Sequence, residues 1–132
     1  MSALLAYDGR PTSDPALEYA ILYAIRFEEP LYILTVVKDD QDHPSENDVR
    51  EYMQAAQKRA ISEGATVHTI IEIGKPDETV VDVAERYDCS AIILGRPERS
   101  TLDRFFLGSV SDYVARNARG TVILVSEKTD EA

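Results

Sequence analysis

The sequence predicts an α/β fold: an open, parallel five-stranded sheet in the order 3-2-1-4-5, with helices on both faces. Apolar stretches of strand length alternate with helix-like stretches along the whole chain, in the pattern β-α-β-α-β-α-β-α-β. Four of these strands are apolar throughout, as strands covered on both faces should be, and the third is partly polar, as an exposed edge would be. Right-handed crossovers then favour this strand order, with a topological switch between the first and fourth strands.

The first elements are a strand, a turn, a helix and a second strand. The apolar run Ala3–Tyr7 predicts the first strand, and Asp8 with the following glycine predicts its closing turn. A helix is expected within residues 11–27, with Ser13 as its N-cap and a proline in its first turn. The second strand is expected over Leu31–Val37, a nearly continuous apolar run.

The middle of the chain supplies a helix and the partly polar strand. Ser45 and Asp48 resemble a capping box at the start of the helix, and Gly64 is a suitable residue just past its end. Apolar residues recur between them at helical spacing, at Val49, Met53, Ala56 and Ala60. The strand that follows, residues 65–73, alternates in part. Four of its residues should share one face (Val67, Thr69, Ile71 and Ile73), with His68 and Glu72 on the other.

The last third of the chain completes the pattern. A helix opens at Pro76 and has apolar positions at Val80, Val81, Ala84 and Tyr87. The fourth strand is expected over Ser90–Gly95, the fourth helix within residues 108–118 and the fifth strand over Thr121–Val125. The whole forms one domain over residues 1–127, followed by a flexible charged tail over residues 128–132.

Composition narrows the class of protein. The chain has 132 residues and a net charge of −10, which disfavours binding to a nucleic-acid backbone. No apolar run is long enough to span a bilayer. The first residues lack the basic region of a signal peptide, and a single cysteine, Cys89, fits a reducing compartment, so we expect a cytoplasmic protein. Neither His43 nor His68 belongs to a cluster at metal-ligand spacing, so no metal site is predicted.

The loop after the fourth strand is the most informative segment. Ligands of such sheets bind beyond the carboxyl ends of the strands at the topological switch, where Asp8 and Gly95 are expected. Gly108-Ser109 would open a helix there and present free backbone N–H groups to an anion. Arg96, Arg99 and Arg104 make the loop locally basic, although Glu98 lies among them. This pattern favours a small anionic ligand.

The chain resembles the universal stress protein family over nearly its whole length. The resemblance lies in "LLAYDGRPTSDPALEYA", "LYILTVV", "GKPDETVVDVAERYDCSAIILG" and, most distinctively, "GSVSDYVARNARGTVILV". It implies a Rossmann-like fold of the adenine nucleotide alpha hydrolase type. ATP-binding members carry Gly-x-x-Gly, nine residues, then Gly-Ser or Gly-Thr. Gly95 and Gly108-Ser109 match this motif at the right spacing, and Glu98 replaces its second glycine.

The resemblance implies the residues of a nucleotide site. Asp8 and Val36 would contact adenosine, and the phosphates would be surrounded by a larger set: Gly95, Gly108, Ser109, Val110 and Ser111, with charge added by Arg96 and Arg99. The ligand would be ATP or another adenine nucleotide, with or without Mg²⁺. Glu98 opposes such binding through backbone strain or charge repulsion, unless Arg99 or a metal ion neutralises it.

Two functions from different classes follow. The first is a nucleotide-binding sensor or regulator in the stress response, rather than an enzyme, because no catalytic constellation can be assembled from the sequence. The second is a protein–protein interaction module whose pocket has degenerated at Glu98. In either case a homodimer is expected, because members of the family commonly pair their last strands and Thr121–Val125 is an uncharged apolar edge.

Overall fold

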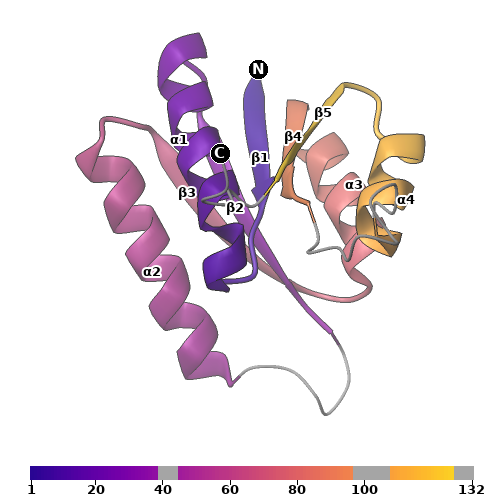
Figure 1. The fold of residues 1–132 in the computed structure, drawn as a ribbon, viewed down its shortest axis with the longest axis horizontal. Helices are drawn as coiled ribbons and strands as arrows, with labels where there is room; N and C mark the ends of the chain where they lie inside the picture. The colour runs from indigo at the N-terminus through magenta and orange to yellow at the C-terminus, as the bar shows by residue number, and fades with distance from the viewer. Residues whose placement is uncertain (39–44, 97–107, 127–132) are drawn as a thin grey trace, which may run out of the picture.

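The structure, a computed structural model, describes residues 1–38, 45–96 and 108–126. Five strands form one parallel sheet in the order β3-β2-β1-β4-β5, as predicted (Figure 1). The strands are β1 (Ser2–Ala6), β2 (Leu31–Val37), β3 (Val67–Ile73), β4 (Cys89–Gly95) and β5 (Thr121–Val125). Of the sequence predictions, those on Glu98, Arg99, Arg104 and residues 128–132 lie outside the described residues.

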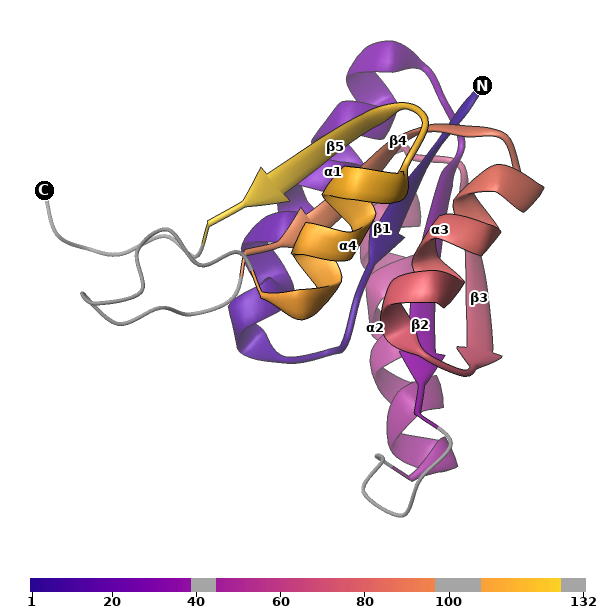
Figure 2. The same ribbon diagram turned by 90° about the vertical axis from the view of Figure 1, so that its right-hand side faces the viewer.

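Two helices cover each face of the sheet (Figures 1 and 2). On one face lie α1 (Asp14–Phe27), which follows the short 3₁₀ helix η1 (Pro11–Ser13), and α2 (Glu46–Ser62). On the other lie α3 (Pro76–Arg86) and α4 (Ser109–Asn117). None of the helices in the described part of the chain combines the length and apolar character that crossing a membrane requires.

Alternation along β1 divides the core into two layers. The Leu5 side chain packs with α1 and α2, whereas the neighbouring Leu4 side chain packs with α3 and α4, and both are fully buried. Because successive side chains of a strand point to opposite faces, a central strand covered on both faces must be apolar at every position. This is why the all-apolar strands β1, β2 and β4 lie inside the sheet, whereas β5, which is also apolar throughout, forms its second edge.

The partly polar strand β3 is an edge, as predicted, but its burial differs from the simple alternation. Val67 is buried, while Ile71 and Ile73, on the same predicted face, are 45% and 71% exposed. Helix α2 reaches over β3 without covering the side chains at its carboxyl end. The strand also begins at Val67, two residues later than predicted.

Two further predictions were slightly wrong near the N-terminus. Strand β1 covers residues 2–6 instead of 3–7. Ser13 does precede α1, but its side chain makes no capping hydrogen bond. Its backbone is already helical (φ −94°, ψ −2°) because η1 leads directly into α1, whereas a capping residue normally has extended dihedral angles. The Ser13 hydroxyl therefore turns back toward the loop before it.

Candidate functional site

The carboxyl ends of β1 and β4 lie at the same edge of the sheet, and the first turn of α4 begins at that edge (Figure 2). The two strands are neighbours in register, with Leu5 opposite Ile93 and Ala6 opposite Leu94. Asp8, two residues past the end of β1, and Gly95, the last residue of β4, therefore lie at the same end of neighbouring strands. This is the topological switch at which open α/β sheets bind ligands.

Asp8 is fixed by its own turn. Its Oδ1 accepts a hydrogen bond from the Arg10 backbone N–H at 2.9 Å and another from the Ser13 hydroxyl at 3.0 Å. Its Oδ2 lies 3.9 Å from the Arg10 guanidinium Nε, and the Asp8 side chain remains 59% exposed. The turn role considered for this residue is thus present, and the carboxylate still faces solvent.

Ser13 joins the turn of Asp8 to the end of β4, a contact that sequence reasoning missed. Its hydroxyl lies 2.7 Å from the Arg10 carbonyl as well as 3.0 Å from Asp8. A Cβ placed on Gly95 would be 3.9 Å from the Ser13 Cα, an ordinary van der Waals distance. Protein packing therefore does not require a glycine at position 95.

The start of α4 provides backbone donors. Gly108 has φ +85°, a conformation that favours glycine, and it occupies the N-cap position without a side chain to cap the helix. Its carbonyl accepts the first helical hydrogen bond, from the Asp112 N–H at 3.0 Å. The N–H groups of residues 109–111 precede that bond, and the first N–H groups of any α-helix have no intrahelical acceptor. They carry the positive end of the helix dipole.

The remaining predicted residues surround this edge in different ways. Ser109 is exposed, Val110 is half-buried and Ser111 is 4% exposed. Arg96 continues β4, with its backbone N–H donating to the Val125 carbonyl at 2.8 Å and its Nε buried. Val36 lies in β2, one residue before its carboxyl end, and its half-buried side chain packs with the core layer under α3 and α4.

An aromatic pair on the α2 side of the Asp8 turn was not predicted. The ring of Tyr52, from α2, lies against the backbone of Gly9, and its centroid is 5.8 Å from that of Tyr7 in an edge-to-face arrangement. Burial raises the pKa of Tyr52, opposed by the nearby Thr35 hydroxyl. Burial also raises the pKa of Tyr7, and the Asp14 carboxylate adds to that increase. No periodicity in the sequence indicates this contact, because Tyr52 lies beside the buried stripe of α2.

The described residues contain no group of three or more His, Cys, Asp or Glu side chains that could hold a metal ion. Cys89 is half-buried at the start of β4, and burial raises the pKa of its thiol. It lies at the opposite, amino-terminal edge of the sheet from Asp8. A half-buried thiol with a raised pKa, away from the Asp8 edge, fits a structural residue better than a nucleophile.

Comparisons with known proteins show the family of the chain and agree with its fold. The model of the universal stress protein family matches residues 1–126. The chain is 28% identical to universal stress protein MJ0531 of Methanocaldococcus jannaschii over 94% of this chain and 81% of that protein. It is 29% identical to universal stress protein Sll1388 of Synechocystis over 61% of this chain, and that match spans 52% of the relative's length.

Solved structures share the fold. A universal stress protein from Archaeoglobus fulgidus in complex with dAMP superposes with a TM-score of 0.75 at 24% identity, over 95% of this chain and 97% of that one. A universal stress protein in complex with cAMP superposes with a TM-score of 0.78 at 22% identity, over 96% of this chain and 98% of that one. At these identities the likeness concerns the fold.

Proposed function

Because the chain belongs to the universal stress protein family, we propose that it binds an adenine nucleotide at the carboxyl ends of β1 and β4. We propose further that it acts as a sensor or regulator in the stress response and not as a fast enzyme. The single observation that carries the proposal is the convergence of the Asp8 turn, Gly95 and the first turn of α4 on one edge of the sheet. Structures of the same fold in complex with dAMP and cAMP support it.

The residues present at this edge fit such a ligand. Gly95 is not needed by the packing of the protein, since a Cβ there would clash with nothing. A glycine in that place is explained if a ligand approaches the end of β4 closely. The N–H groups at the start of α4, which have no acceptor within the helix, suit phosphate oxygens. The exposed Asp8 carboxylate suits the hydroxyl and amino donors of a nucleoside.

Magnesium would accompany the phosphates. Mg²⁺ in nucleotide sites usually keeps several waters and is held by substrate phosphates with one or two carboxylates. Since the described residues group no three acidic or imidazole ligands, the metal would depend on the nucleotide for most of its coordination. Affinity for Mg²⁺ alone should therefore be weak.

Isothermal titration calorimetry with ATP and magnesium tests the proposal. We expect saturable heat and an increase in melting temperature, because a ligand that binds only the folded state stabilises it. AMP and tripolyphosphate, titrated separately, report on the two ends of the ligand. No heat and no thermal shift at millimolar ATP would rule the proposal out.

The second candidate, an interaction module with a degenerate pocket, rests on Glu98 in place of the second motif glycine. It predicts that the wild type does not bind ATP and that Glu98→Gly creates or greatly improves binding. Glu98→Gln removes the charge and keeps a non-glycine backbone, so it separates repulsion from strain. Micromolar ATP binding by the wild type would remove the support for this candidate.

We also propose that the chain forms a homodimer through β5. The strand is at the edge of the sheet, carries no charged residue and is half-exposed over Val122, Ile123, Leu124 and Val125. The Val125 carbonyl accepts from Arg96 on the β4 side. Alternate residues of a strand direct their backbone groups to alternate sides, so those of Val122 and Leu124 face outward. A second copy of β5 would satisfy them.

A further inference from the structure

Tyr52 is the aromatic side chain that lies against the turn carrying Asp8. A Cβ placed on Gly9 would lie 2.5 Å from both Cγ and Cδ2 of Tyr52 and 2.8 Å from its Cδ1. Near-equal distances to three adjacent ring atoms mean that the face of the ring covers the Gly9 backbone. Gly9 has φ +77° and follows Asp8 directly, so the ring covers the turn one residue after the carboxylate.

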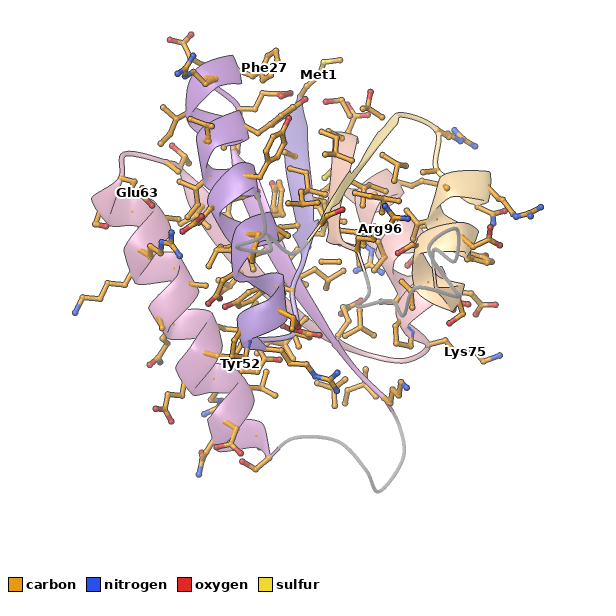
Figure 3. All side chains as sticks on the ribbon, in the orientation of Figure 1. Met1, Phe27, Tyr52, Glu63, Lys75 and Arg96 are labelled. Carbon is orange, nitrogen blue, oxygen red and sulfur yellow. The ribbon has the colours of Figure 1, made fainter. Side chains whose placement is uncertain are left out.

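Tyr52 also reaches the residue before Asp8. Its ring meets that of Tyr7 edge to face at 78°, and Thr35, close to the Tyr52 hydroxyl, donates a hydrogen bond to the Tyr7 carbonyl at 2.7 Å. Gly9, the residue after Asp8, therefore lies against the Tyr52 ring. Tyr7, the residue before Asp8, contacts that ring and also accepts the hydrogen bond from Thr35. Figure 3 shows Tyr52 near the first turn of α1.

The position of Tyr52 relative to the proposed ligand follows from the topology. The donors suited to phosphate lie at the β4 and α4 side of the edge, whereas Tyr52 lies at the β1 and β2 side, against Gly9 and Thr35. A nucleotide with its phosphates at α4 and its nucleoside beside Asp8 directs its base toward the β2 side. A base has apolar faces, and aromatic side chains are the common partners of such faces.

We propose that Tyr52 is a specificity-determining residue, which makes the β1–β2 end of the site selective for a nucleoside over a bare polyphosphate. The inference rests on the nucleotide-binding function proposed above. The Tyr52 ring contacts Tyr7 and Gly9, the residues on either side of Asp8, and so fixes the position of the Asp8 turn. A nucleoside bound there would therefore meet a fixed carboxylate beside an aromatic side chain. The phosphate end, at Gly95 and Gly108, is independent of it.

The test compares ATP with tripolyphosphate by calorimetry on the wild type and three variants. Tyr52→Leu removes the ring, Tyr52→Phe keeps the ring and removes the hydroxyl, and Tyr87→Leu is a matched control at the amino-terminal edge of the sheet. We expect Tyr52→Leu to weaken ATP binding about tenfold, the usual scale of losing one aromatic contact to a base. Tripolyphosphate affinity should change less than about twofold in all three, since phosphate contacts are untouched. Tyr52→Phe and Tyr87→Leu should retain the wild-type ratio.

A proton NMR spectrum checks the geometry in each protein. The Gly9 Hα resonance, shielded by the ring face, should be displaced in the wild type and in Tyr52→Phe and return toward its usual position in Tyr52→Leu.

If the wild type binds ATP and Tyr52→Leu keeps the same preference for ATP over tripolyphosphate, the role of Tyr52 is overturned while the proposed function stands. The same conclusion follows if the wild type binds both ligands equally. Absence of any ATP binding by the wild type overturns the proposed function and this inference with it.

Discussion

At the scale of single residues, Gly9 is constrained twice. Its backbone has φ +77°, and a Cβ at that position would lie 2.5 Å from the Tyr52 ring. We expect Gly9→Ala to lower the free energy of unfolding by about 2–4 kcal/mol, because left-handed strain costs about 1 kcal/mol and overpacking about 1–3 kcal/mol. Urea denaturation followed by circular dichroism measures the loss.

Gly64 is the matched control for this prediction. It has φ +101° with nothing within 4 Å of an added Cβ, so Gly64→Ala introduces the backbone strain alone. Its expected cost is about 1 kcal/mol. Equal losses in the two variants would show that contact with Tyr52 contributes nothing at Gly9.

The buried phenols predict how stability responds to alkaline pH. Burial raises the pKa values of Tyr7 and Tyr52 above 10.0 in the folded chain. The folded state then keeps protons that the unfolded state loses, so the stabilisation is complete below about pH 10 and declines as the pH rises through the folded pKa values. We expect the free energy of unfolding to fall as the pH rises above about 10, and to fall less in the double variant Tyr7→Phe/Tyr52→Phe. A pH series of urea denaturations measures both slopes, and identical slopes would contradict the burial argument.

At the scale of elements, the two serines that precede helices behave differently. Ser45 has extended backbone angles and its Oγ accepts the Asp48 N–H at 3.1 Å, whereas Ser13 makes no such bond to α1. Ser45→Ala should therefore destabilise the fold by about 1 kcal/mol, the usual value of an N-cap. Ser62→Ala, at the other end of α2, should cost less than about 0.5 kcal/mol. Thermal unfolding of both variants decides between them, and a neutral Ser45→Ala would contradict the capping role.

Elements were more predictable than contacts. Periodicity identified the strands, and the partly polar β3 could be assigned to an edge because a central strand covered on both faces must be apolar. The capping bond of Ser45 was predictable from the local sequence. Ser13 does occupy the predicted N-cap position of α1, but its missing capping bond could not be predicted, because the 3₁₀ turn before α1 changes its backbone angles. The contact between Tyr52 and Gly9 joins residues 43 positions apart, and no local pattern encodes it.

At the scale of the whole molecule, the outward backbone groups of β5 predict assembly. Sedimentation should show a dimer at micromolar concentration. Val122→Pro removes an outward N–H and should yield a monomer, whereas Val122→Ala truncates the side chain, keeps the N–H and should remain a dimer. A monomeric wild type would refute pairing through β5, and a dimeric Val122→Pro would place the interface elsewhere.

The central claim is that an adenine nucleotide binds at the carboxyl edge of the sheet, between the Asp8 turn and the start of α4. The most direct test is a titration of the ¹⁵N-labelled protein with ATP and magnesium, followed through backbone amide resonances. The account predicts saturable shifts at Gly9, Gly95 and residues 108–111, with little change at Cys89 and Gly120 on the opposite edge. An unchanged spectrum at millimolar ATP, or shifts confined to that opposite edge, would contradict it.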